Sequence, residues 1–150
     1  MKMISFSMLF IALFSFAAFD KTVTTLQTPT CTDSIPYILG NFEDDYGIHY
    51  KITDSVWAQG SGIKYHILQW NKKEQCIIAR NDNNNPTEAG LYTRIDYMQF
   101  ENMQPWTWGF CYTVYKAKTD SDARNALAAD RNNPRKGCNG YPFSRMKKID

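Results

Sequence analysis

The strongest constraint on the fold of this chain is the alternation of apolar and polar residues along several short stretches. The clearest examples are residues 48–53, 63–67, 91–97 and 106–115. Successive side chains of a β-strand point to opposite faces, so a period of two predicts strands with one buried face. Turn-forming residues separate these stretches, as at 60–62 and in the Asn-rich loop 81–86.

Shorter apolar runs at residues 35–42, 56–58 and 76–79 extend this pattern to about seven strands. Short connections favour antiparallel neighbours, and closure would remove the exposed edges of such a meander. We therefore predict a mainly β fold, an antiparallel meander that forms a small barrel or a sandwich. In the last long stretch, one face carries Trp106, Trp108, Phe110, Tyr112 and Val114.

One short helix is expected after the last of these strands. Thr119 is a suitable N-cap, and Asp122 stands three positions later, as in a capping box. Ala123, Ala126 and Leu127 would form a narrow apolar stripe on this C-terminal helix. The Asn-Asn-Pro sequence at 132–134 would end it.

The N-terminus has the pattern of a signal peptide. Lys2 precedes a mostly apolar run at 4–16, which is too short to cross a bilayer as a helix. Small residues favour cleavage after Ala17. We expect a signal peptide at 1–17, a flexible leader at 18–33 and a single disulfide-linked β domain at 34–150, although a retained anchor helix is the alternative. The mature protein would be secreted, to the extracellular space or the periplasm, with no transmembrane segment.

The cysteine count agrees with export. The four cysteines are Cys31, Cys76, Cys111 and Cys138, and all follow the expected cleavage site. An even number in an exported chain predicts two disulfides, for which we favour Cys31–Cys76 and Cys111–Cys138 among three possible pairings. No Cys-x-x-Cys spacing is present, so we expect no metal centre and no cofactor.

The net charge of +2 is too small to favour nucleic acid as a partner. Its distribution is uneven, because residues 20–115 hold seven basic and eleven acidic side chains, and residues 116–150 hold nine basic and four acidic. We expect the basic segment to pack against the acidic body. The alternative is a patch for an anionic surface or glycan, or for a protein partner.

Aromatic residues near loops are the best candidates for ligand contacts, because aromatic rings stack on sugars and line pockets. The candidate binding residues are Trp57, Tyr92, Arg94, Tyr97, Trp106 and Trp108, with the loops 81–90 and 99–105 beside them. For Trp108 and Phe110 we favour a position in the core, whereas Trp106, at the end of a loop, suits either role. Arg94 and Asp96 share one strand face, so we favour a structural ion pair, with a polar ligand site inside a barrel as the alternative.

No catalytic motif is present, and we assign no catalytic residue. His49 and His66 could meet only if their strands are neighbours, and solvent-facing positions are the simpler expectation. The sequence favours non-enzymatic binding of a small molecule or saccharide through an aromatic-lined site. The alternatives are an extracellular structural or protein-interaction role that uses the basic C-terminal segment, or a secreted hydrolase.

Three short motifs resemble those of calycins, the lipocalin and avidin barrels. Gly40-Asn41-Phe42 is similar to the Gly-x-Trp of the first strand, residues 45–47 to the avidin hairpin, and Ile95-Asp96-Tyr97 to a late lipocalin turn. The resemblance implies a ligand cavity inside a barrel. The pattern of 92–97, Cys111-Tyr112 and Gly137-Cys138 also resembles secreted proteins of unassigned function.

Overall fold

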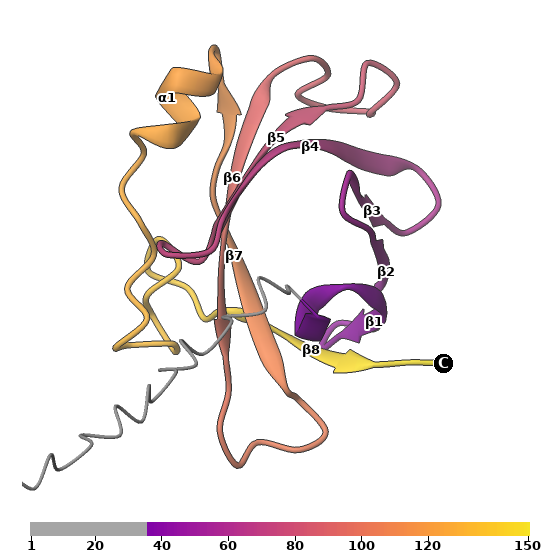
Figure 1. Ribbon diagram of the computed structural model, residues 1–150, viewed down its shortest axis with the longest axis vertical. Coiled ribbons are helices and arrows are strands. Elements are labelled where there is room, and N and C mark those ends of the chain that lie inside the picture. Colours follow the sequence, from indigo (N-terminus) through magenta and orange to yellow (C-terminus); the bar gives the residue numbers. More distant parts are fainter. Residues whose placement is uncertain (1–35) are drawn as a thin grey trace, which may run out of the picture. The chain divides into compact units, whose positions relative to one another are not determined.

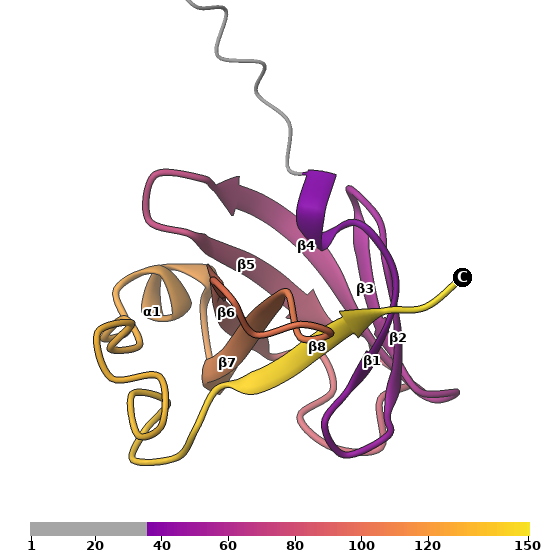
Figure 2. The same cartoon turned by 90° about the horizontal axis from the view of Figure 1, so that it is seen from below.

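Eight antiparallel strands form a closed barrel in the order of the sequence, with β8 paired to β1 (Figures 1 and 2). The structure is a computed structural model that describes residues 36–150, so the predicted signal peptide and leader lie outside the described residues. The strands are β1 (Gly40–Asp44), β2 (His49–Ile52), β3 (Val56–Gln59), β4 (Ile63–Asn71), β5 (Cys76–Asn81), β6 (Tyr92–Gln99), β7 (Trp108–Ala117) and β8 (Ser144–Lys148). The prediction of a mainly β meander is confirmed, and it closes as a barrel.

Aromatic side chains occupy the interior of the barrel. Trp57 and Trp108 are completely buried, and their ring centroids lie 6.0 Å apart. Phe42 of β1 meets Trp108 edge to face at 5.1 Å, and Phe110 meets Trp57 at 5.0 Å. Edge-to-face pairs add about 0.5–1.5 kcal/mol each beyond the burial of their surface. The core interpretation of Trp108 and Phe110 is therefore confirmed.

A second layer covers the outside of β5, β6 and β7. It consists of α1 (Asp120–Arg124) and the long connection from α1 to β8, which Figure 2 shows beside these three strands. Ala123 of α1 packs with Ile78 and Ala117 on the outer face. The capping box of Thr119 and Asp122 is present as predicted. The helix ends at Arg124, so Leu127 lies beyond it and is 88% exposed, which corrects the longer apolar stripe that we expected.

β-bulges explain why Val114 leaves the inner face. Arg94 pairs with Val114, but the next residue, Ile95, pairs with Tyr112, so Thr113 is an extra residue in β7. Beyond this bulge Val114 packs on the outer side with Ile78. The alternation of residues 106–115 therefore predicts the inner face correctly only from Trp108 to Tyr112, because Trp106 precedes β7 and lies outside the core.

The structure also differs from the prediction before β1 and at β8. Residues Pro36–Ile38 form a 3₁₀ turn, and β1 begins only at Gly40. Proline lacks an N–H group and suits the first turn of a helix, which explains this start. β8 was not predicted, because Met146 is its only apolar residue and the strand shows no alternation.

Among residues 36–150 one disulfide is found, where we predicted two for the chain. Cys111 and Cys138 are bonded as predicted and fix the connection between α1 and β8 to β7. Cys76 is free and only 2% exposed, and Cys31 lies outside the described residues. Counting cysteines fails here because a buried cysteine is also satisfied as a small apolar side chain.

Candidate functional site

Three of the six predicted ligand-binding residues belong to the barrel interior. Trp57, Tyr97 and Trp108 are each at most 3% exposed. The Trp57 indole Nε1 donates a hydrogen bond to the Tyr112 hydroxyl over 3.0 Å. The Trp108 Nε1 has no hydrogen-bond partner among the described residues. These three rings support the barrel from within.

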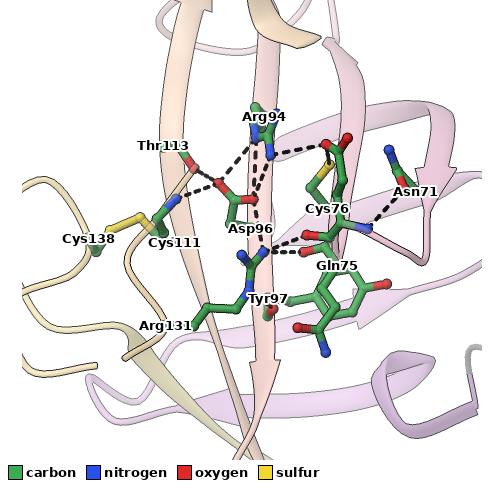
Figure 3. Close-up of polar contacts among 12 residues, drawn as sticks. Asn71, Gln75, Cys76, Arg94, Asp96, Tyr97, Cys111, Thr113, Arg131 and Cys138 are labelled. Carbon is green, nitrogen blue, oxygen red and sulfur yellow. Dashed lines mark hydrogen bonds and ion pairs between the residues drawn. A yellow bond between two sulfur atoms is a disulfide. The ribbon is translucent and has the colours of Figure 1, made fainter. Parts of the chain in front are cut away.

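Arg94 lies on the outer face of β6, where it is 3% exposed (Figure 3). Its Nη2 donates to the completely buried carboxylate of Asp96 over 3.1 Å, which confirms the structural ion pair that we predicted. Arg131, from the covering connection, donates to the same carboxylate over 3.1 Å. Asp96 also accepts hydrogen bonds from the Thr113 hydroxyl and, over 3.1 Å, from the backbone N–H of Ala129. We call these residues the Asp96 cluster, and it holds the covering connection on the barrel.

Cys76 lies beside the Asp96 cluster (Figure 3), and its Sγ is 3.9 Å from the carboxylate of Glu74. Burial raises the pKa of this thiol to about 11, although the charge of Arg94 acts in the opposite direction. A neutral thiol is a poor nucleophile at physiological pH. Cys76 therefore offers no reactive centre here. Tyr92, another predicted ligand residue, is partly buried and packs nearby against the apolar contact of α1 with the barrel.

Trp106 lies in the loop between β6 and β7 and is partly exposed. The guanidinium of Arg145 lies 5.2 Å from the centre of its ring, and the Nζ of Lys147 lies 5.5 Å from it. The six predicted residues thus lie in three places: the barrel interior, the outer face beneath α1, and the loop between β6 and β7. They do not form one aromatic surface.

The two loops that we expected to share a site lie at opposite ends of the barrel (Figure 1). β6 begins after the loop 82–91 and ends before the loop 100–107, and it has eight residues. At about 3.3 Å per residue, this strand separates the two loops by roughly 26 Å. A pocket is found at each of these ends.

The first pocket lies at the end of the barrel next to the loop 82–91 and has a volume of about 220 Å³. We call it the mouth pocket. Its lining includes the inward-facing residues of β3, β4 and β7 near that end, together with the loop, and its members include Gln59, Tyr65, Asn85, Glu88, Tyr112 and Tyr115. Asn85 shapes the rim, because its side chain bonds both the N–H and the carbonyl of Lys64.

Hydrogen bonds fix the floor of the mouth pocket. The Tyr112 hydroxyl accepts from Trp57 and donates to the Gln59 Oε1 over 2.9 Å. The Tyr65 and Tyr112 rings lie 5.4 Å apart and are tilted by 37°. Burial raises the pKa of Tyr65, a hydrogen bond with Tyr112 opposes this, and the charge of Glu88 raises the pKa further. Burial also places the pKa of Tyr112 well above its usual value, so both phenols are neutral at physiological pH.

Two polar groups of the mouth pocket have no partner within residues 36–150. They are the amide nitrogen of Gln59, whose oxygen alone is bonded, and the carboxylate of Glu88. Of the residues that line the mouth pocket, only those of the loop 81–90 were predicted from the sequence. The sequence contains two signals for this pocket: the alternation that turns Tyr65 and Tyr112 inward, and the polar composition of residues 81–86.

The second pocket lies at the other end, beside the loop 100–107, and has a volume of about 320 Å³. We call it the loop pocket. Phe100, Met103, Pro142 and Phe143 contribute apolar walls, and Arg135 and Arg145 contribute positive charge. A third pocket of about 270 Å³ lies next to Cys76 and Arg94.

The histidines are exposed, as expected, and each pairs with its own carboxylate. His49 lies 3.3 Å from Glu43, and His66 lies 2.6 Å from Asp82. β3 separates their strands, so two strand spacings, about 9.6 Å, lie between them. That separation is too large for two ligands of one zinc ion, and no group of three metal-ligating side chains occurs among residues 36–150.

The basic C-terminal segment packs against the acidic body, as we preferred. Lys147 bonds Glu43 over 2.8 Å, and Arg145 bonds Asp45 over 2.9 Å. Arg131 adds the contact to Asp96 described above. Arg135 is exposed and has no partner within the described residues.

Comparisons with known proteins found no matching family model, no matching curated protein and no matching solved structure. Within the part of the chain that the structure describes, no helix is long and apolar enough to cross a membrane.

Proposed function

We propose that this chain is a secreted, non-enzymatic binding protein that holds a small polar molecule, with a saccharide as the leading class, in the mouth pocket. The observation that supports this proposal is the pair of unused groups, the Gln59 amide and the Glu88 carboxylate, in a pocket with three tyrosines. An amide N–H and a carboxylate can donate to and accept from sugar hydroxyls. A neighbouring tyrosine ring can stack on the apolar face of a sugar.

The rest of the site matches the needs of binding more than those of catalysis. The hydrogen bonds from Trp57 through Tyr112 to Gln59 fix the floor before any ligand arrives. A preformed site loses less conformational entropy when it binds its ligand. At about 220 Å³, the pocket suits a single sugar unit or a molecule of similar size.

Saturation-transfer NMR and calorimetry with a panel of neutral mono- and disaccharides test this proposal. Tyr115 is 46% exposed, so Tyr115→Ala removes one ring of the pocket with little risk to the fold. We expect this variant to weaken binding by about threefold to tenfold. Tyr141→Ala is the matched control, because Tyr141 is 73% exposed and lies outside the pocket. Equal effects of the two variants, or no binding by any sugar, would contradict the proposal.

Glu88→Gln identifies the class of ligand. This change keeps the shape of the side chain and its ability to hydrogen-bond, but it removes the only charge among the lining residues. Binding of a neutral saccharide should therefore change by less than about threefold. A loss of tenfold or more, together with binding of an organic ammonium ion included in the panel, would replace the saccharide by a cationic ligand.

A further inference from the structure

We propose that the loop pocket is a second and independent binding site, which takes a small organic anion: an apolar body that carries one carboxylate. Several segments of the chain line this pocket. The loop between β6 and β7 contributes Phe100 and Met103, and the segment before β8 contributes Arg135 and Phe143. The cavity of about 320 Å³ lies in the range of small-molecule sites.

The apolar walls are fixed in place. Phe143 is 2% exposed and packs with Cys111, whose disulfide to Cys138 ties this segment to β7. The ring of Phe100 covers Gly109 so closely that an added Cβ there would lie 2.6 Å from the ring. Backbone hydrogen bonds close the loop, from Phe100 to Thr107 and from Trp106 to Met103, each over 2.9 Å. An apolar ligand therefore meets a preformed surface and gains by displacing water.

The charge of the pocket favours an anion. Among its lining residues, two arginines face one acidic residue, Asp45. Asp45 is already occupied, because its two oxygens accept from the backbone N–H of Arg145 over 3.1 Å and from the Arg145 Nε over 2.9 Å. Within residues 36–150, the terminal nitrogens of Arg145 make no hydrogen bond, and the guanidinium of Arg135 has neither a hydrogen-bond nor an ion-pair partner. A guanidinium binds a carboxylate through two parallel hydrogen bonds.

Apolar walls beside the unpaired guanidinium of Arg135 and the terminal nitrogens of Arg145 define the occupant by its chemistry. A purely apolar ligand would leave Arg135 without a counter-charge, and a fully polar anion would leave Phe100, Met103 and Phe143 without a contact. A molecule with one carboxylate on an alkyl or arylalkyl body uses both features. This assignment does not depend on the mouth pocket, which lies at the opposite end of β7.

Trp106 provides the signal for the test. Arg145 lines the loop pocket and also lies 5.2 Å from the centre of the Trp106 ring. A carboxylate bound to Arg145 changes the charge above this indole and hence its fluorescence. The probes are decanoate, below its critical micelle concentration, and phenylpropionate. Decanol is the matched neutral control, since it has the same alkyl body as decanoate without the charge.

We expect at least one of the two carboxylates to bind saturably. If decanoate binds, its affinity should be at least about fivefold higher than that of decanol. Arg135→Gln should weaken carboxylate binding by about fivefold. Among residues 36–150, Arg135 has no partner whose loss could disturb the fold. Lys118→Gln is the matched control, because it removes one exposed positive charge at the far end of β7. Higher salt should weaken binding of the carboxylate more than that of decanol.

Several results would overturn this inference. They are the failure of both carboxylates to bind by calorimetry, equal affinity of decanoate and decanol, and equal effects of Arg135→Gln and Lys118→Gln. Tyr115→Ala separates the two sites, because it should weaken saccharide binding at the mouth pocket and leave carboxylate binding unchanged. A loss of carboxylate binding in Tyr115→Ala would place the anion elsewhere and would also overturn the assignment.

Discussion

Removing the carboxylate of Asp96 should destabilise this protein more than removing any exposed acidic group. Asp96 is completely buried and neutralises Arg94, which is 3% exposed. Its partners are the two guanidinium groups of Arg94 and Arg131, the Thr113 hydroxyl and the Ala129 N–H. In Asp96→Ala, the buried Arg94 guanidinium would keep only the carboxylate of Glu74, which is 3.6 Å away and 57% exposed, as a counter-charge.

The size of the effect follows from this geometry. Breaking a buried ion pair by removing one partner costs about 3–5 kcal/mol. The lost hydrogen bond to Ala129 adds to this cost, but the contributions are coupled and do not simply sum. We expect the free energy of unfolding to fall by about 4 kcal/mol, out of a total of about 5–15 kcal/mol for a domain of this kind. The covering connection should also become more susceptible to proteases.

Urea unfolding followed by tryptophan fluorescence, with Cys111–Cys138 oxidised, measures this loss. Asp120→Ala is the matched control, because the ion pair of Asp120 with Arg124 is 40–49% exposed and should contribute less than about 1 kcal/mol. Asp96→Asn keeps the size of the side chain and gives a smaller loss of the same sign, which is measurable even if Asp96→Ala does not fold. A loss for Asp96→Ala no larger than that for Asp120→Ala would refute the reasoning.

Three further predictions concern packing, the free thiol and pH. Gly137→Ala should lower the free energy of unfolding by more than about 2 kcal/mol, because the added Cβ would overlap the Asp130 carbonyl oxygen. Gly62→Ala is the control, because open space surrounds Gly62, and it should change the free energy of unfolding little. Urea unfolding measures both. Cys76 should resist iodoacetamide at pH 8 in the native protein and react in denaturant, because burial raises the pKa of its thiol to about 11. Peptide mapping measures this labelling, and rapid labelling of the native protein, or a disulfide at Cys76, would contradict the prediction. Burial raises the pKa of Tyr97 to about 12, so the folded state disfavours its phenolate. The resulting contribution to the free energy of unfolding is complete below pH 10 and should be lost between pH 10 and 12. A free energy of unfolding that stays constant over this range would disprove the prediction.

The sequence predicts the strands well where one face of the sheet is buried and the other is exposed. The alternation through Tyr50, Tyr65 and Phe110 marks the inner face correctly. It fails where the outside of the barrel is also covered. On β5, residues 76–79 are all buried, because Ile77 and Ala79 face the core and Ile78 faces α1. A local pattern carries no information about this second layer.

The candidate site was predictable only in part, because its residues come together through closure of the barrel. The aromatic content pointed to a binding surface, but Trp57 and Trp108 are needed to fill the interior. Gln59 and Glu88 had no distinctive local pattern. They are close only because the last residue of β3 and the loop 82–91 lie at the same end of the barrel. The bulge at Thr113 was also unpredictable, since it depends on the register between β6 and β7.

The central claim is that the barrel interior is structural and that a small polar ligand binds at its mouth. Backbone amide NMR during titration with the tightest-binding saccharide of the panel tests this claim most directly. We predict that the largest shift changes occur at Gln59, Tyr65, Glu88 and Tyr115, with little change at Phe42 and Met146 in the interior. Shift changes centred on Phe42 and Met146, or no saturable change with any saccharide, would contradict the account.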